Sequence, residues 1–255
     1  MGVFPADHIV VDEAEFRRTI RRAVELAQTP GVMVVLGVPP TRPETGYGYI
    51  ETGSETAQGV TRVRRFTEKP NVTRAEQMLT AGNFSWNSGM FVWRASTLAD
   101  AIREHLSETA PYLEQIAAAW GTPQFEAKFA ELYPLCENIS LDYAVLEPRS
   151  TKGEHASKIF CLPASFGWND LGSWAALYEQ QAIGNANVIE GAGEYAWHAQ
   201  GNYVFSPKQY VALVGVEDLI VVQTEDALLI ASRDHSQEVG RVVRHLKSIG
   251  REELL

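Results

Sequence analysis

The sequence of 255 residues lacks most of the features that mark secreted, membrane and redox proteins. It has only two cysteines, Cys136 and Cys161, with no CxxC spacing, so it predicts neither a disulfide framework nor a thiolate zinc site. No apolar run approaches the roughly 20 residues that a membrane-spanning helix needs. These absences favour a globular protein of the cytosol.

The sequence also has no excess of basic charge. It contains 22 Lys and Arg residues against 32 Asp and Glu residues, which gives a formal net charge of −10. Nucleic acids and acidic membrane surfaces are bound by basic patches, so neither is an expected partner. An anionic substrate would have to meet a few cations placed close to it.

Neither an internal repeat nor a low-complexity segment is evident. Gly191 and Gly193 lack a third glycine in dinucleotide-binding register, so a Rossmann fingerprint is rejected there. Hydrophobic residues make up 45% of the chain, which is enough for a sizeable core, and the length predicts one or two domains.

The first 40 residues predict an α/β arrangement. Residues 12–28 form the expected helix, because acidic residues occupy its first turn and Thr29-Pro30-Gly31 stops it. Residues 32–37 are a continuous apolar run, which is typical of a strand covered on both faces. With the short strand that ends at Pro5, these segments predict a β-α-β unit with a parallel sheet.

Glu68 and Lys69 follow a predicted strand at residues 62–66, which stops before Pro70. Ligands of α/β sheets bind beyond the carboxyl ends of strands. A carboxylate can accept hydrogen bonds from sugar hydroxyls, and an ammonium can meet a phosphate. The pair therefore predicts a sugar-phosphate site, and a solvated ion pair at a strand end is the alternative.

Two further positions suit a ligand. Gly46 and Gly48 flank Tyr47 and would let the backbone approach a ligand closely, although a simple turn explains the glycines equally well. Asn87 can satisfy a pair of hydroxyls or, alternatively, fix a local turn.

Asp7 and Asp170 are candidate metal ligands at two predicted strand ends. Two carboxylates brought together need a cation between them, and Mg²⁺ prefers one or two carboxylates with substrate oxygens. The alternatives are helix caps: Asp7 for the helix at 12–28, and Asp170 for a helix at 171–180.

The remaining pattern predicts more helices and a change of composition. A helix at 75–81 would start at a capping box in residues 73–76. Further helices are expected at 96–105, 111–120 and 123–132, with Leu113, Ile116 and Trp120 forming one of the packing faces. After residue 181, turn clusters separate short strands at 203–205, 210–214, 219–223 and 227–231, and a helix at 235–246 closes a small β domain.

Five motifs occur in order at residues 4–8, 67–70, 86–91, 140–145 and 166–174. The second reads Thr67-Glu68-Lys69-Pro70 and the third Trp86-Asn87-Ser88-Gly89-Met90-Phe91. Together they resemble the sugar-nucleotide pyrophosphorylases, and most closely their mannose-1-phosphate guanylyltransferase group.

The resemblance implies an enzyme that makes GDP-mannose and pyrophosphate from mannose 1-phosphate and GTP, with Mg²⁺ as cofactor. It implies the C-terminal part of a Rossmann-like, mixed-sheet nucleotidyltransferase domain at residues 1–180, followed by a small β-rich domain at residues 181–255. A homodimer is an expected assembly, with the β-rich domain covering the catalytic domain or pairing subunits.

The resemblance also assigns roles to single residues. Asp7, Lys69 and Asp170 form the expected catalytic set, with Asp7 and Asp170 on the metal and Lys69 on the sugar phosphate. The sugar is assigned to Gly48, Glu68, Asn87 and Asp142. For Asp142 the alternative is an acid in the first turn of its helix that stabilises only the helix.

In this family a glycine-rich loop carrying an Arg and a Lys grips the nucleotide, upstream of the motif found here at residues 4–8. Such a loop is absent from the sequence, so we expect the C-terminal part of an enzyme, either an incomplete record or one half of a split arrangement. The alternatives are a sugar-phosphate-binding or scaffold fragment without turnover, and the same chemistry with another sugar or nucleotide. A fused phosphomannose isomerase is not expected.

Overall fold

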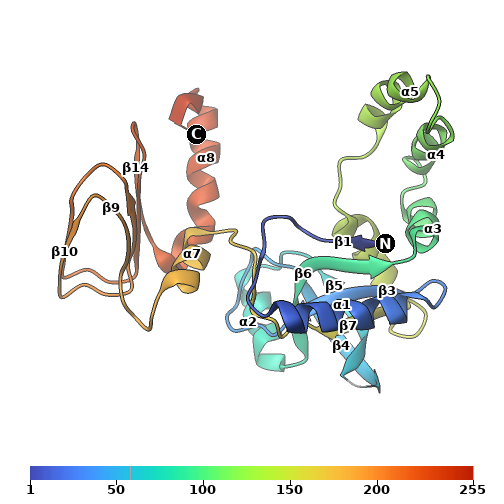
Figure 1. Ribbon diagram of the computed structural model, residues 1–255, viewed down its shortest axis with the longest axis horizontal. Coiled ribbons are helices and arrows are strands. Elements are labelled where there is room, and N and C mark those ends of the chain that lie inside the picture. Colours follow the sequence, from blue (N-terminus) through green and yellow to red (C-terminus); the bar gives the residue numbers. More distant parts are fainter. Residues whose placement is uncertain (58, 255) are drawn as a thin grey trace. The chain divides into compact units, whose positions relative to one another are not determined.

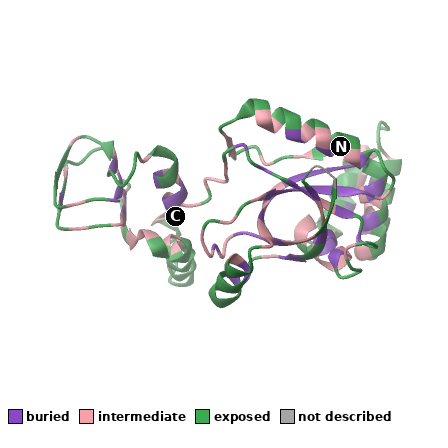
Figure 2. Cartoon of the chain, turned by 90° about the horizontal axis from the view of Figure 1, so that it is seen from below, coloured by how far each residue is buried: buried purple, intermediate pink, exposed green. Residues whose placement is uncertain are grey.

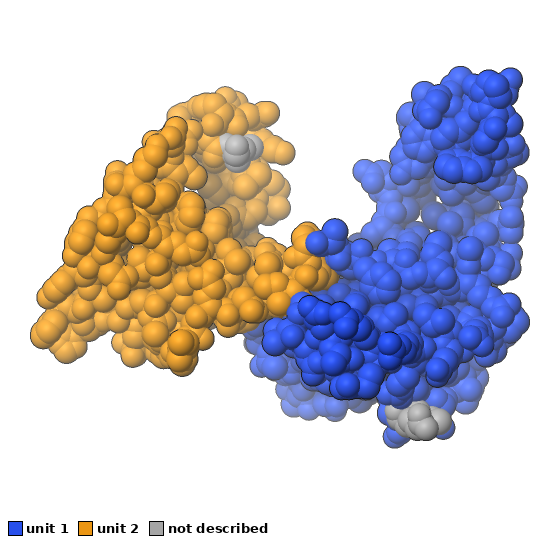
Figure 3. Space-filling model, in the orientation of Figure 1, with its two compact units in different colours: residues 1–6, 10–168 blue, residues 7–9, 169–255 orange. Residues whose placement is uncertain are grey.

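The structure is a computed structural model that describes residues 1–57 and 59–254. The chain forms two compact units, coloured separately in Figure 3. Unit 1 comprises Met1–Ala6 and Val10–Trp168, and unit 2 comprises Asp7–Ile9 and Asn169–Leu255. Within the described ranges, no helix combines the length and apolar character that crossing a membrane requires.

Unit 1 is built on a six-stranded sheet with the order β1-β6-β3-β7-β5-β4 (Figure 1). Its strands are β1 (Gly2–Val3), β3 (Met33–Val38), β4 (Tyr49–Ala57), β5 (Val60–Thr67), β6 (Phe84–Trp93) and β7 (Ile159–Pro163). Because β4 also pairs with β6, five of these strands join into a ring, which is visible in Figure 2. The β3–β7 pair is parallel, whereas β6 pairs antiparallel with β1, β3 and β4. The mixed sheet of the expected fold class is therefore confirmed.

The predicted β-α-β unit is present, since β1 and β3 run in the same direction, but its sheet is mixed rather than parallel. β6 lies between β1 and β3 and is antiparallel to both. β6, which comes much later in the chain, thus lies beside β1, where the local pattern predicts β3.

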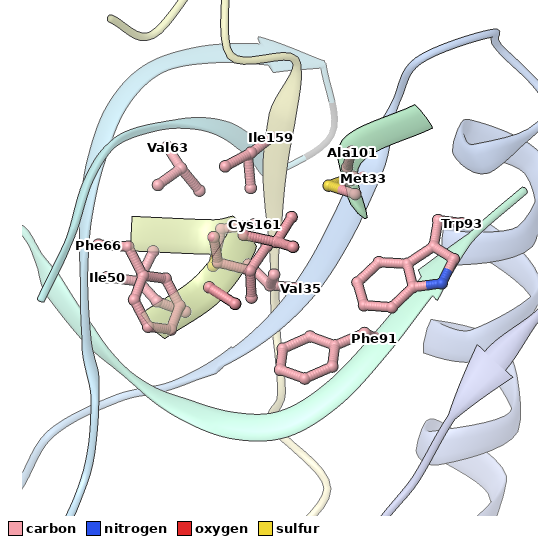
Figure 4. Close-up of a cluster of buried hydrophobic side chains, with 13 residues drawn as sticks. Met33, Val35, Ile50, Val63, Phe66, Phe91, Trp93, Ala101, Ile159 and Cys161 are labelled. Carbon is pink, nitrogen blue, oxygen red and sulfur yellow. The ribbon is translucent and has the colours of Figure 1, made fainter. Parts of the chain in front are cut away.

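The two faces of β3 enter two separate hydrophobic cores, as the alternation of side chains along a strand requires. Met33 and Val35 pack with residues from the other strands of the ring, and Figure 4 shows these side chains pointing toward one another. Val34 and Leu36 instead join the core beneath helix α1 (Glu13–Ala27), which Ala23 enters fully buried. The continuous apolar run in this strand follows from having both faces covered.

Helices α1 and α2 (Val72–Ala81) begin at capping side chains. Asp12 accepts a hydrogen bond from the amide of Glu15 at 2.9 Å, and Asn71 accepts from the amide of Arg74 at 3.0 Å. The capping box predicted at residues 73–76 is wrong, because the chain is already helical there.

Three helices follow β6, namely α3 (Ala95–His105), α4 (Ala110–Ala118) and α5 (Phe125–Leu132), and then a short 3₁₀ turn, η1 (Tyr133–Leu135). Their existence is as predicted. The packing assignment of Trp120 is wrong, because this residue lies just beyond α4 and is 74% exposed, with an edge-to-face contact to Phe125 at 4.8 Å. A π-helix, η2 (Asp142–Leu146), and helix α6 (Glu147–Ser150) lead into β7.

Unit 2 contains helix α7 (Trp174–Gln181), which is followed by stacked coils of short strands. The strands are β9 (Val188–Gly191), β10 (Glu194–Trp197), β11 (Tyr203–Ser206), β12 (Val211–Val214), β13 (Leu219–Gln223) and β14 (Leu228–Ser232). β9, β11 and β13 pair in parallel, and so do β10 and β12, whereas β14 is antiparallel to β13. A 3₁₀ segment, η3 (Arg233–Glu238), helix α8 (Val239–Ser248) and a last turn, η4 (Glu252–Leu254), follow.

The coils contain an internal repeat, so the expectation of no repeat is wrong. Asn187, Asn202 and Asp218 each precede the first strand of a coil, at spacings of 15 and 16 residues. The buried Asn202 amide donates to Asn187 Oδ1 at 2.9 Å, and its Oδ1 accepts from the amide of Leu219 at 2.9 Å. The repeat was overlooked because three polar residues before strands of four or five residues give a weak signal.

Candidate functional site

The Asn-Ser-Gly sequence of β6 forms an irregularity in the sheet. The register of β6 against β3 shifts just before Gly37, which lies opposite Asn87. Gly89 has φ +69°, a conformation that glycine adopts readily. The buried hydroxyl of Ser88 donates to the carbonyl of Leu36 at 2.8 Å and so satisfies a group that the shifted ladder leaves over. Such bulges re-aim side chains and are common beside functional sites.

Asn87 is held at this bulge by three hydrogen bonds. Its side-chain amide donates to Asp142 Oδ1 at 2.8 Å, and its own Oδ1 accepts from the amide of Gly89 at 3.1 Å. Its backbone amide donates to the carbonyl of Gly48 at 2.8 Å. Three residues that the sequence assigned to the sugar therefore meet here.

Gly48 is buried where there is no room for a side chain. A Cβ at this position would collide with Oε2 of Glu68 and lie 3.3 Å from the Cβ of Asn87. The glycine thus allows the backbone to approach Glu68 closely, which a simple turn would not require.

Glu68 lies just past the end of β5, with one carboxylate oxygen buried. Among the described residues, its Oε2 has no hydrogen-bond partner. The pKa of Glu68 is raised to about 7, chiefly by burial; the charges of Asp142 and Glu147 add to the rise, and Lys69 opposes it. An unpaired carboxylate oxygen of this kind can accept a hydrogen bond from a hydroxyl group of a ligand.

Lys69 is exposed and adopts an unusual backbone conformation. Its φ is +43°, in the left-handed region, although the residue before a proline normally favours an extended conformation. Its positive charge favours the ionised forms of both Glu68 and Asp142, so the three groups are electrostatically coupled.

Asp142 begins the π-helix η2, a form of helix that is rare and frequent at functional sites. Burial raises the pKa of Asp142, and the hydrogen bond from Asn87 opposes that rise. The amide of Phe66 donates to the hydroxyl of Ser150 at 3.0 Å, which ties the end of β5 to the end of helix α6. The strand that leads to Glu68 is therefore fixed to the helix that directly follows η2 and Asp142.

The residues Gly48, Glu68, Lys69, Asn87 and Asp142 are called the sugar-side cluster from here on. They combine two carboxylates and an amide with one ammonium, a set that can bind hydroxyl groups beside an anionic group. Sequence reasoning left Glu147 out of this neighbourhood, although its charge acts on Glu68. Its position five residues after Asp142, on the same helical segment, is the signal that could have found it.

Asp7 and Asp170 both belong to unit 2. The side chain of Asp7 is 87% exposed, with an oxygen 4.0 Å from Nε2 of His8, and Asp170 Oδ1 accepts from the amide of Gly172 at 3.1 Å. Both helix-cap alternatives are wrong, because Asp12 caps α1 and Ser173 caps α7, which starts at Trp174 rather than at residue 171. Their role as metal ligands stays a prediction.

The described residues contain no group of three or more His, Cys, Asp and Glu side chains arranged to hold a metal ion. A pair of aspartates nevertheless fits Mg²⁺, since that ion commonly takes one or two carboxylates and completes its shell with substrate oxygens and water.

The sequence profile of the nucleotidyl transferase family matches residues 1–185, and the chain belongs to this family. Residues 198–246 match a second profile, the MannoseP isomerase/GMP-like beta-helix domain, which agrees with the parallel coils of unit 2.

Two of the relatives found by sequence similarity carry specific names. A mannose-1-phosphate guanylyltransferase of Escherichia coli is 36% identical over 260 residues, which cover 99% of this chain and 52% of that protein. The alginate biosynthesis protein AlgA of Pseudomonas aeruginosa is 36% identical over 259 residues, which cover 98% of this chain and 51% of that protein. The chain thus spans about half the length of the curated relatives that it matches.

A solved structure from Thermus thermophilus, described as a mannose-1-phosphate geranyltransferase, superposes with a TM-score of 0.79. It is 33% identical, and the match covers 96% of this chain and 69% of that one.

Proposed function

We propose that this chain carries the sugar-phosphate side of a mannose-1-phosphate guanylyltransferase, which forms GDP-mannose and pyrophosphate from mannose 1-phosphate and GTP. The observation that carries the proposal is the convergence of the sugar-side cluster from four separate segments of unit 1. The relatives named as mannose-1-phosphate guanylyltransferases support the choice of sugar and nucleotide.

In the proposed reaction, the phosphate oxygen of mannose 1-phosphate attacks the α-phosphorus of GTP in line, and pyrophosphate leaves. Catalysis then consists of positioning and charge neutralisation. Lys69 neutralises the sugar phosphate, whereas Glu68, Asn87 and Asp142 orient the hydroxyls of the ring.

Asp7 and Asp170 would hold the Mg²⁺ in this proposal. The bound ion would neutralise charge that develops on the phosphate oxygens. The proposed location is the cytosol, which two cysteines without a disulfide support.

Two alternatives remain. One is a sugar-phosphate-binding or scaffold role without turnover, and the other is the same chemistry with another sugar or nucleotide.

The proposal is tested by calorimetric titration of the purified chain with mannose 1-phosphate and with GTP, each with and without Mg²⁺. Mannose 1-phosphate binding that depends on the sugar-side cluster supports the proposal, and GDP-mannose formation by the chain would exclude the scaffold role. Failure of mannose 1-phosphate to bind would overturn the proposal.

A further inference from the structure

The loop between β3 and β4 carries a buried carboxylate that the sugar-side cluster does not include. Glu44 is only 7% exposed, and a buried charge is costly unless it is paired and hydrogen-bonded. Its Oε1 accepts from the amide of Gly46 at 3.0 Å, and its Oε2 accepts from Nε of Arg42 at 3.2 Å. The amide of Glu44 also donates to the carbonyl of Arg42 at 3.0 Å. The carboxylate of Glu44 is therefore hydrogen-bonded to the residues two positions before it and two positions after it.

Arg42 is in turn anchored to the strand that carries Asn87. Its guanidinium lies over the ring of Trp86, 5.5 Å from the centroid, and its carbonyl accepts from the hydroxyl of Tyr49 at 3.5 Å. Tyr47 meets the same indole edge to face at 5.2 Å. Trp86 immediately precedes Asn87, so the loop and the bulge of β6 share one aromatic support.

We propose that Glu44 is a positioning residue that sets residues 44–48 against the sugar-side cluster and thereby tunes the affinity for the sugar phosphate. This inference rests on the proposed function. Gly48 ends the segment. Its carbonyl accepts from the amide of Asn87, and a Cβ at this position would collide with Oε2 of Glu68. A loop released at Glu44 would shift the Gly48 backbone and disturb the unpartnered oxygen of Glu68.

A purely stabilising role explains this arrangement less well. The Arg42 side chain is 33% exposed, and an ion pair with a partner that meets solvent contributes little net stability. The Arg42–Glu44 pair instead holds the backbone of residues 42–46 in one conformation beside the sugar-side cluster.

The test compares Glu44→Ala, which removes both contacts, with Glu44→Gln, which keeps an acceptor for Gly46 but loses the charge facing Arg42. Glu55→Ala is the matched control, since Glu55 Oε1 accepts from the amide of Gly59 at 2.8 Å in the turn after β4. The dissociation constant for mannose 1-phosphate is measured by calorimetry, alongside the thermal midpoint and the NMR shift of the Asn87 side-chain amide.

We expect Glu44→Ala to weaken binding by roughly 10 to 100-fold, which is the effect of losing one hydrogen bond to a charged group of the ligand or the site. Glu44→Gln should fall between Glu44→Ala and the wild type, and Glu55→Ala should bind as the wild type does. The Asn87 amide resonance should move in both Glu44 variants and stay unchanged in Glu55→Ala. An unmoved resonance in a folded Glu44→Ala or Glu44→Gln variant overturns the inference, whether or not the sugar phosphate binds. Absence of binding to the wild type overturns the proposed function instead.

Discussion

The side-chain amide of Asn87 donates to the carboxylate of Asp142 at 2.8 Å, although 55 positions separate the two residues in the chain. The bond joins the bulge of β6 to the π-helix η2. It leaves a carboxylate and an amide side by side at the surface where Glu68 and Lys69 arrive from β5.

Replacing Asn87 by Ala should weaken binding of mannose 1-phosphate by about 0.5 to 1.5 kcal/mol, the usual net contribution of a hydrogen bond between an amide and a hydroxyl. Calorimetry of Asn87→Ala, Asp142→Ala and the double variant measures this effect. Because the two residues are in contact, the double variant should lose less than the sum of the single losses. Strictly additive losses would show that the two side chains act independently.

Replacing Glu68 by Gln should change how stability depends on pH. The pKa of Glu68 is raised from 4.5 to about 7, so the folded state disfavours ionisation between these values. Below pH 4.5 the carboxyl is protonated in both states and has no effect. As the pH rises through about 7, the wild type loses stability and Glu68→Gln does not.

Urea unfolding of both proteins at pH 5 and pH 8 checks this prediction. The free energy of unfolding of Glu68→Gln, relative to the wild type, should be larger at pH 8. An equal difference at the two pH values would show that burial does not perturb this carboxyl.

Gly48→Ala should impair binding while the chain remains folded, because the added methyl group collides with Oε2 of Glu68 at the edge of the sheet. Gly240→Ala is the matched control. This residue lies in α8, and an added Cβ would meet only Nη1 of Arg244, at 3.8 Å, so the substitution should stabilise the helix by about 0.5 to 1 kcal/mol. Thermal melting and calorimetry of the two variants should therefore diverge, and wild-type binding by Gly48→Ala would show that the space is not needed.

Asn202→Ala should destabilise the coils of unit 2. It is fully buried, and its loss leaves the amide of Leu219 without the acceptor Asn202 Oδ1, at a cost of about 1 to 3 kcal/mol. Gln200→Ala, at an exposed position of the same coil, should change stability by less than about 0.5 kcal/mol. Hydrogen exchange at the Leu219 amide measures both, and similar protection in the two variants would contradict the assignment.

The members of the sugar-side cluster could be selected from the sequence because they lie in recognisable motifs, and Glu68 and Lys69 directly follow a strand. Their binding of a sugar phosphate stays a prediction. Gly48, Glu68 and Asn87 needed no knowledge of distant pairing to be selected. Their mutual contacts did need it, because the bulge of β6 and the π-helix depend on which strands become neighbours. The position of β6 between β1 and β3 is set by such long-range pairing, which local patterns do not encode.

Other errors have equally specific causes. Helical spacing selected Trp120 as a packing residue, but periodicity identifies a face and not what covers it. The cap of α2 was placed at Thr73, whereas Asn71 accepts the bond two residues earlier. Asp7 and Asp170 both belong to unit 2, and their role as metal ligands stays a prediction.

The parallel coils of unit 2 have a consequence for how the protein can vary. Each coil pairs only with the coils directly above and below it, so its contribution to stability is largely a nearest-neighbour quantity. One coil of about 15 residues could be inserted or deleted without changing how the strands of the other coils pair. Length variation among homologues should therefore accumulate in this region, whereas the closed ring of unit 1 tolerates no comparable change.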